Sequence, residues 1–260
     1  MSRMAEPARV DSDGLAVEQG LFVYGVIDAM ADLPEWVVGL DDAPLRKVVH
    51  ERVAAVVTTI TVERPPGRRV DLLAFSGTLD AVAEVGPVIP VQFGSVLADE
   101  TGVIEELLAA REPELVATLD GLRGRAQFTV QARYLEQVVL SEIVASSPQI
   151  AELRRRTREL PEDMAYGDRV RLGELVARAM EEKRAIDADL LLDVILPFTV
   201  AHVIRPASGL ERLLEASLLV DIGRQQELER ALETLAEGVV DRIRLRLMGP
   251  MAPYDFAGDA

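Results

Sequence analysis

The chain has 260 residues, of which 49% are hydrophobic, and this share predicts a folded protein with a sizeable core rather than a disordered chain. It contains no cysteine and only two histidines, which excludes disulfides and thiolate catalysis and leaves little for a metal cluster. A net charge of −16 argues against a nucleic-acid partner and against attachment to an anionic membrane surface.

The N-terminal residues 1–18 are polar, lack the apolar stretch of a secretory signal, and are predicted to form a disordered tail. Elsewhere no stretch reaches the ~20 apolar residues that are needed to cross a bilayer. We therefore expect a soluble protein that works in the cytoplasm.

Residues 19–134 are predicted to form an N-terminal α+β domain of the ferredoxin-like type. Strands are indicated by apolar, β-branched runs, and helices by apolar residues at helical spacing. A loop around Trp36, punctuated by proline and glycine, follows the first strand. The expected strands are Leu21–Ile27, Arg52–Val62, 88–93 and Gln127–Tyr134. The expected helices are Val70–Val85, with Leu72 and Leu73 counted on the same apolar face as Phe75, and one from about Asp99 to Leu119 that Pro113 kinks or restarts.

Residues 135–248 are predicted to form a second, helix-rich α+β domain. Its first helical stretch spans 135–160 and restarts at Ser147–Pro148, a helix cap followed by a first-turn proline. The elements expected after it are a loop at Pro161–Gly167, a long helix from Asp168 to Leu196 with a break near Asp187, strands at 201–204, 215–221 and 241–248, and an amphipathic helix at 224–239.

Residues 249–260 are predicted to form an extended C-terminal tail. Gly249–Pro250 and Pro253 are not expected to extend the preceding strand, because proline has no backbone donor. The tail also carries the aromatic residues Tyr254 and Phe256, which rarely lie free in solvent. We therefore expect the tail to cover an edge of the protein's own core, with a partner site nearby.

No motif for nucleotide binding or nucleophilic catalysis is present, and we assign no catalytic, cofactor-binding or metal-binding residue. The carboxylates of Asp187, Asp189 and Asp193 are interpreted as a solvated acidic surface rather than a metal site. On the residues alone, a small-molecule-binding regulatory protein remains open, and it would need an apolar pocket with convergent polar groups. An enzyme that uses scattered carboxylates also remains open, and it would need a cleft with perturbed acids.

Three landmarks, in their order and spacing, resemble those of the gas vesicle protein F and L family, and the resemblance covers Leu21 to Phe256. They are a Tyr24–Gly25 pair in the opening strand, the element Pro90-Val91-Gln92-Phe93-Gly94, and a tail with Gly249, Pro250, Pro253, Tyr254 and Phe256. The chain departs from the family pattern at Gln92, Ala252 and Gln127, where relatives usually carry arginine, proline and glutamate. If that arginine and glutamate pair in relatives, Gln92 and Gln127 form an uncharged replacement.

The resemblance implies a two-domain α+β protein that is an accessory or minor component of gas vesicles and needs no cofactor. It also implies binding to the hydrophobic main gas vesicle shell protein (GvpA) and to other accessory gas vesicle proteins during assembly. An acidic carrier fits this role, because its charge keeps a complex with an aggregation-prone partner in solution. We expect the partner to bind the first domain, at the edge strand Leu21–Ile27, at the exposed Trp36 and at the sheet face near Phe128 and Val130. The candidate residues are Phe22, Tyr24, Trp36, Phe128 and Val130.

Overall fold

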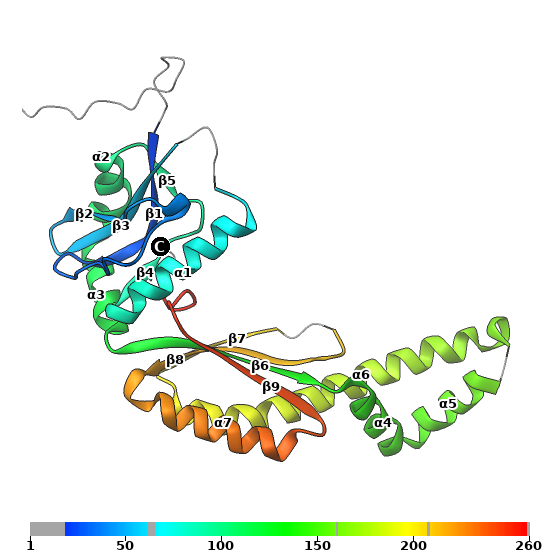
Figure 1. The fold of residues 1–260 in the computed structure, drawn as a ribbon. Helices are drawn as coiled ribbons and strands as arrows, with labels where there is room; N and C mark the ends of the chain where they lie inside the picture. Colours follow the sequence, from blue (N-terminus) through cyan, green and yellow to red (C-terminus); the bar gives the residue numbers. More distant parts are fainter. Residues whose placement is uncertain (1–18, 62–65, 160, 207–208, 259–260) are drawn as a thin grey trace, which may run out of the picture. The chain divides into compact units, whose positions relative to one another are not determined.

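The structure is a computed structural model that describes residues 19–61, 66–159, 161–206 and 209–258, with the backbone alone at 162–164. The chain divides into two compact units (Figure 1): unit 1 comprises the residues up to Gln127 together with those from Pro250 onwards, and unit 2 comprises Phe128–Gly249. Both units combine helices with an antiparallel sheet, so the predicted α+β class is confirmed. The tail predicted at 1–18 lies outside the described residues.

Unit 1 is built around β1 (Gln19–Asp28), which lies inside its sheet. The strand order is β2-β3-β1-β4, and β5 pairs with β1 as well. The prediction that this strand forms an edge is therefore wrong, and the short strand β2 was not predicted. The bounds of the other strands are β2 (Arg46–His50), β3 (Val53–Thr61), β4 (Val88–Pro90) and β5 (Val96–Leu97).

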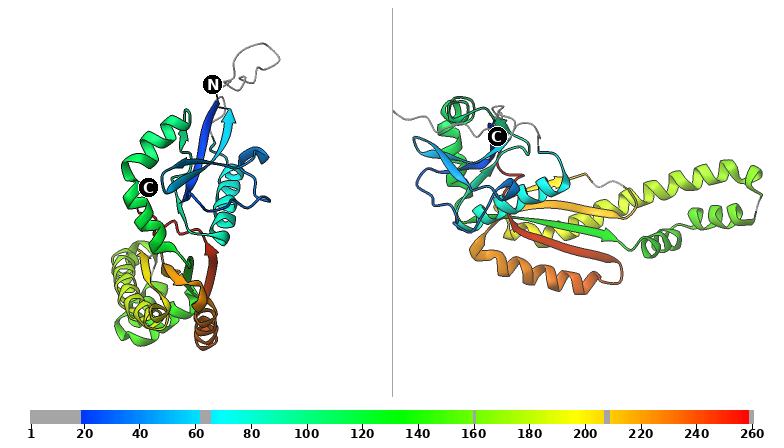
Figure 2. Two further views of the ribbon diagram at one scale, coloured as in Figure 1. Left: turned by 90° about the vertical axis from the view of Figure 1, so that its left-hand side faces the viewer. Right: turned by 45° about the horizontal axis from the view of Figure 1, so that its top comes forward.

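Helices cover both faces of this sheet, with α1 (Arg69–Val85) on one side and α3 (Glu112–Leu122) on the other (Figure 2, left). Since both faces are buried, β1 and β3 are almost continuous apolar runs instead of alternating apolar and polar residues. The core on the α1 side consists of Phe22, Tyr24, Ile27, Leu40, Ala54, Val56, Phe75, Leu79, Val82, Val88 and Ala252.

The helical segment that precedes α3 changes its winding twice. A short α2 (Glu100–Gly102) leads into a π-helical stretch (Val103–Leu108) and a 3-10 turn (Ala109–Arg111). α3 then begins at Glu112, with Pro113 in its first turn, where the missing N–H is tolerated. The predicted restart at Pro113 is confirmed.

Unit 2 has the βαββαβ order of a ferredoxin-like fold. Its sheet has the order β7-β8-β6-β9, and α6 and α7 lie on one face of it (Figure 1). The sequence predicts this arrangement for the N-terminal domain; the structure corrects it to unit 2, because β6 is an inner strand of the second sheet. The expected boundary after Tyr134 accordingly moves into β6, between Gln127 and Phe128. The bounds are β6 (Arg125–Tyr134), β7 (Ala201–Arg205), β8 (Arg212–Asp221), α7 (Gln225–Val239) and β9 (Ile243–Met251).

Three helices are inserted between β6 and β7: α4 (Glu136–Ser146), α5 (Pro148–Glu159) and α6 (Glu162–Ile195). The predicted restart at Ser147–Pro148 is confirmed, because Ser147 Oγ accepts a hydrogen bond from the backbone N–H of Ile150 at 3.3 Å. The predicted loop at Pro161–Gly167 is wrong, since α6 already begins at Glu162. The expected break near Asp187 is also wrong, because α6 continues to Ile195.

A cluster of charged side chains joins the inserted helices to the sheet of unit 2. Arg242 donates to both carboxylate oxygens of Glu142 at 3.1 Å and also pairs with Asp187. The Tyr134 hydroxyl donates to Asp187 at 2.6 Å, and Lys183 Nζ lies 2.7 Å from Glu142. Burial raises the pKa of Glu142, but hydrogen bonds from Lys183 and Arg242 outweigh it and hold the pKa below its ordinary value. The interpretation of Asp187 as a solvated acid is therefore wrong, because it is buried in this cluster.

β9 continues through Gly249 and Pro250 to Met251, although the sequence predicts that the strand stops before them. β9 is the last strand in the sheet order, so one of its two edges has no neighbouring strand in this sheet. Proline is tolerated in such an edge strand because its missing donor interrupts no ladder. The tail proper begins after Met251.

Candidate partner-binding groove

The C-terminal tail is fixed to unit 1 by hydrogen bonds at two points. The backbone N–H of Ala252 donates to Asp80 Oδ1 on α1 at 2.8 Å. Further on, the backbone N–H of Asp255 donates to Gln127 Oε1 and Gln127 Nε2 donates to Asp255 Oδ2, both at 2.9 Å. Ala252, Pro253 and Ala257 are buried. The tail thus covers an edge of its own core, as the sequence predicts.

Gln127 suits this position because its amide supplies a donor and an acceptor at once. It is buried, with 3% of its surface exposed, and both groups of its amide are used by Asp255. Gln92, in contrast, is exposed. Gln127 therefore pairs with the tail, and the expected uncharged pair of Gln92 and Gln127 is replaced by the pair of Gln127 and Asp255.

The Pro90–Gly94 element forms the end of β4 and a tight turn. β4 ends at Pro90, and the N–H of Val91 still donates to the carbonyl of Tyr24 at 3.0 Å. Ser95 then donates from its backbone N–H to the carbonyl of Gln92 at 3.2 Å, with Gly94 at φ 93° between them. This left-handed conformation favours glycine. The strand predicted at 88–93 is therefore shorter, and its second half is the turn.

This turn places Phe93 in an aromatic cluster with Phe22, Tyr24 and Phe75. The ring centroid of Phe75 lies 5.3 Å from that of Phe93, 5.7 Å from that of Tyr24 and 5.8 Å from that of Phe22. The Tyr24 hydroxyl accepts a hydrogen bond from the backbone N–H of Leu40 at 2.7 Å, and burial raises the pKa of Tyr24 to about 12. The cluster is a packed core whose outer edge is Phe93.

The Tyr24–Gly25 pair is also structural. A Cβ at Gly25 would lie 2.7 Å from the carbonyl oxygen of Ile89 and 2.9 Å from a methyl group of Val88. Only glycine allows β1 and β4 to approach this closely. The pair therefore fixes the strand that carries the Pro90–Gly94 turn.

Beside the turn and the tail, a groove of about 430 Å³ opens along the outer side of α1. The exposed fractions of its apolar rim are 48% for Leu72 and 37% for Tyr254, and neighbouring Leu73 is 60% exposed. The outward face of the first turns of α1 thus carries leucines where charged residues are usual. We call this surface the α1–tail groove; it is lined by Leu72, Phe75, Ser76, Pro90, Val91, Gln92, Phe93, Tyr254 and Gly258.

Most residues predicted to bind a partner do not lie on the surface. Phe22, Tyr24, Phe128 and Val130 are each 0% exposed, so these four assignments are wrong. The strand that carries Phe22 and Tyr24 is central, and β6 is buried on both faces. Trp36 is 68% exposed and remains a candidate.

The sequence interpretation missed Leu72 and Leu73, because it counted them with the inward face of α1. For Leu73, the helical spacing indicates an outward position. Phe75, Leu79 and Val82 define the buried face, and Leu73 lies two residues from Phe75, on the opposite side of the helix. An apolar residue at such a position has no core to join.

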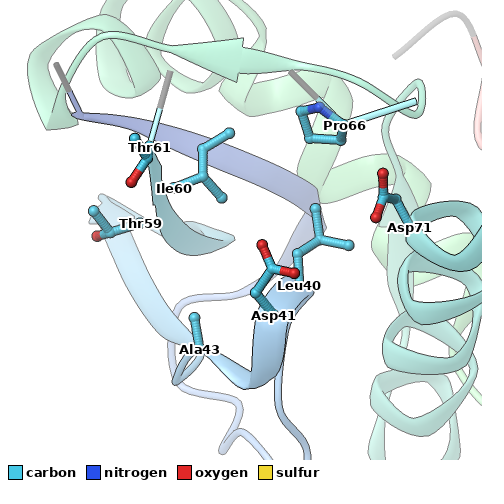
Figure 3. A pocket seen from close by; sticks show the side chains of 8 residues that line it. All are labelled: Leu40, Asp41, Ala43, Thr59, Ile60, Thr61, Pro66 and Asp71. Atoms are coloured by element: carbon cyan, nitrogen blue, oxygen red, sulfur yellow. The ribbon is translucent and has the colours of Figure 1, made fainter. Parts of the chain in front are cut away.

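A second cavity, of about 310 Å³, lies between β3, the start of α1 and the loop that precedes β2 (Figure 3). Asp41 and Asp71 are its acidic residues, and Thr59 and Thr61 supply hydroxyl groups. The carboxylate of Asp71 accepts hydrogen bonds from the backbone N–H groups of Gly67 and Arg68 at 3.1 and 2.9 Å. It therefore serves as the cap of α1 rather than as a ligand group.

Among residues 19–61, 66–159, 161–206 and 209–258, no three acidic or histidine side chains are grouped closely enough to hold a metal ion. Within the same ranges, every helix is too short or too polar to pass through a bilayer.

The chain was compared with known proteins. The family described as gas vesicle synthesis protein GvpL/GvpF matches residues 20–258. Gas vesicle protein F of Streptomyces sp. (strain CB03234) is 29% identical over 238 residues, which are 90% of this chain and 98% of that protein. Gas vesicle protein L of the same strain is 26% identical over 256 residues, which are 88% of each chain.

Solved structures agree on the fold. The crystal structure of GvpF from Anabaena sp. PCC7120 superposes with a TM-score of 0.80 at 19% identity, covering 93% of this chain and 99% of that one. The structure of GvpF from Microcystis aeruginosa gives a TM-score of 0.76 at 19% identity, with 92% and 98% covered. These likenesses establish the fold, and the match over nearly the whole sequence establishes the family: the chain belongs to the gas vesicle synthesis protein GvpL/GvpF family.

Proposed function

We propose that this protein is a non-catalytic accessory protein of gas vesicle assembly that binds the hydrophobic main shell protein in the cytoplasm. Membership of the GvpL/GvpF family supports the assembly role. The relatives that match are named gas vesicle proteins F and L, and none of these names denotes an enzyme. Other accessory gas vesicle proteins are further partners in this proposal.

The observation that carries the proposal is the α1–tail groove. A helix on the surface of a soluble protein normally turns charged residues outward, yet α1 presents Leu72 in the groove with Phe93 and Tyr254, and it exposes Leu73 as well. Such an exposed apolar surface is typical of a site that receives another protein. A groove along a helix suits an apolar helix of the partner, whose side chains fill it at every third or fourth residue.

The landmarks of the family resemblance support the same surface. Pro90, Phe93 and Tyr254 come from distant parts of the chain and all line the groove. Gly94 and the tail contacts at Asp80 and Gln127 hold these residues in place. In this proposal Trp36, exposed on a separate loop, adds contact area for the shell protein or for an accessory protein.

The test is co-expression of the full chain with the main shell protein, followed by affinity purification from the soluble fraction. The unaltered chain is expected to recover soluble shell protein, and Leu72→Glu is expected to lose most of it, because a carboxylate would have to be desolvated in the groove. Leu190→Glu is the control, since Leu190 is another exposed leucine on a helix, α6. Equal recovery by the two variants would place the binding site elsewhere; recovery of no shell protein by the unaltered chain would refute direct binding.

A further inference from the structure

The α1–tail groove has an acidic end. Asp80 follows Ser76 by one helical turn and lies beside Tyr254, since its carboxylate binds the backbone N–H of Ala252. Glu84 follows Asp80 by one further turn, on the same face of α1. Burial raises the pKa of Asp80, and the negative charge of Glu84 raises it further. Asp80 and Glu84 thus continue the face of α1 that carries Ser76 beyond the lining residues, and we call these two charges the acidic end of the groove.

These two charges lack the compensation that several other surface carboxylates in the protein have. Glu114, Glu152 and Glu227 each pair with an arginine three residues away, and Glu182 pairs with Arg178. Within the described residues, no ion pair involves Asp80 or Glu84. Like charges four residues apart destabilise a helix slightly, and within the described residues this repulsion is not offset by an ion pair, although Asp80 accepts the hydrogen bond from Ala252.

We propose, building on the proposed function, that the groove binds an apolar helical segment whose end carries a lysine or arginine that pairs with Asp80 and Glu84. The apolar side chains of that segment lie against Leu72, Phe93 and Tyr254, and its cation meets the acidic end. Leu72 to Glu84 spans 12 residues, or about 18 Å along α1, which corresponds to about three turns of a partner helix. The net charge of −16 favours the approach of a cationic segment over an anionic one.

The test uses three synthetic helical peptides with the same apolar face and a glutamine- and serine-rich outer face. One carries a single lysine at its N-terminal end, one carries it at its C-terminal end, and in the third glutamine replaces it. Binding to the full chain is measured by fluorescence anisotropy at low and high salt. One of the lysine peptides is expected to bind about three- to fivefold more tightly than the glutamine peptide, as for a partly exposed ion pair. High salt is expected to reduce this difference.

The double variant Asp80→Asn/Glu84→Gln is expected to abolish the lysine preference without losing the tail. Asparagine keeps a side-chain oxygen that can accept the hydrogen bond from Ala252. Asp189→Asn/Asp193→Asn on α6 is the matched control, because it removes two exposed carboxylates at the same spacing and should keep the preference. If all three peptides bind the unaltered chain equally, and Leu72→Glu weakens all of them, the cation pairing is wrong while the groove stands. If none of the peptides binds, the groove itself is refuted.

Discussion

The tail of unit 1 and the three-helix insertion of unit 2 are both additions to a sheet, yet they are held by different chemistry. The tail is held over an aromatic core by the Gln127 amide and by the carboxylates of Asp80 and Asp255, which accept hydrogen bonds from a backbone N–H and from that amide. The insertion is held by arginine, lysine and carboxylates around Tyr134. In these bonds the carboxylates of the tail region accept from neutral donors, whereas those of the insertion also pair with cations. The expected effects below test this difference, beginning with the largest.

Phe75→Ala is expected to cost about 3–5 kcal/mol, because it empties the centre of the aromatic cluster. Phe75 is 2% exposed and its ring contacts three other rings. Denaturant unfolding followed by Trp36 fluorescence reports on unit 1 alone, since Trp36 is the only tryptophan. Val85→Ala, at a position on the same helix that is 58% exposed, should change the stability by less than about 0.5 kcal/mol. Similar losses for both variants would contradict the role of the cluster.

Arg242→Met is expected to destabilise unit 2 by about 2 kcal/mol, because it leaves Asp187 buried without its cation. The value is at the lower end for a buried pair, since the Arg242 side chain is 26% exposed. Hydrogen exchange should accelerate in α4 and α6 while unit 1 stays protected. Arg178→Met removes an arginine that is 80% exposed and pairs with Glu182, so it serves as the control. Faster exchange in both units would show that the cluster does not act locally.

Gln127→Glu is expected to loosen the tail at a cost of about 1 kcal/mol. It replaces the amide donor with a carboxylate that faces Asp255. Limited proteolysis of the C-terminal residues should become faster, whereas Gln92→Glu, at an exposed position, should leave the rate unchanged. An unchanged rate for Gln127→Glu would mean that the contact at Asp80 alone holds the tail.

Acid is expected to affect the two units in opposite directions. The pKa of Glu142 is lowered in the folded state, so its contribution to stability is present above the ordinary glutamate value of about 4.3 and is lost as the pH falls through the folded pKa. The pKa of Asp80 is raised, so its contribution is present below the ordinary aspartate value and is lost as the pH rises through the folded pKa.

Measuring the free energy of unfolding at several pH values between about 6 and 3 should separate the contributions of Glu142 and Asp80. Helicity reports mainly on unit 2, and Trp36 fluorescence reports on unit 1. Other carboxylates are expected to make both units less stable in acid. Arg242→Met should make the stability of unit 2 less sensitive to acid, because Glu142 loses a cation that lowers its pKa. Asp80→Asn should make the stability of unit 1 more sensitive to acid, because the contribution that Asp80 makes at low pH is removed. If neither variant changes the pH dependence of its own unit, the two carboxylates do not govern it.

The sequence predicts elements better than it predicts their neighbours. The strands β1 and β3 are predictable because burial on both faces requires a continuous apolar run. The helix α7 is predictable because burial on one face requires apolar residues at helical spacing. An apolar run does not distinguish a central strand from an edge strand. The sequence therefore predicts β1 at the edge of the sheet and Phe22 and Tyr24 on the surface, whereas the strand is central and both residues are buried. The ferredoxin-like order was assigned to the wrong half because the helices α4 to α6 separate β6 from the strands with which it forms a sheet.

The groove could not be predicted from the sequence, for a different reason. Its walls are Leu72 on α1, the turn at Phe93 and the tail at Tyr254, which only the folded chain brings together. The motifs of the family resemblance can be seen in the sequence, but their contacts with one another cannot. For Gly94, the structure adds the reason for the glycine, which is its positive φ in the turn. That Gln127 bonds to Asp255 depends on a contact across 128 residues, which local spacing does not reveal.

The passage of β9 through Pro250 has a consequence for the proposed binding of an aggregation-prone partner. An open sheet edge can recruit further strands and seed a growing β-assembly. Here the edge strand presents the exposed side chains of Arg244 and Arg246, and Pro250, one residue before its end, donates no hydrogen bond. Charged side chains and proline both disfavour the addition of a further strand, so along this edge the proposed partner would meet a surface that does not template β-structure.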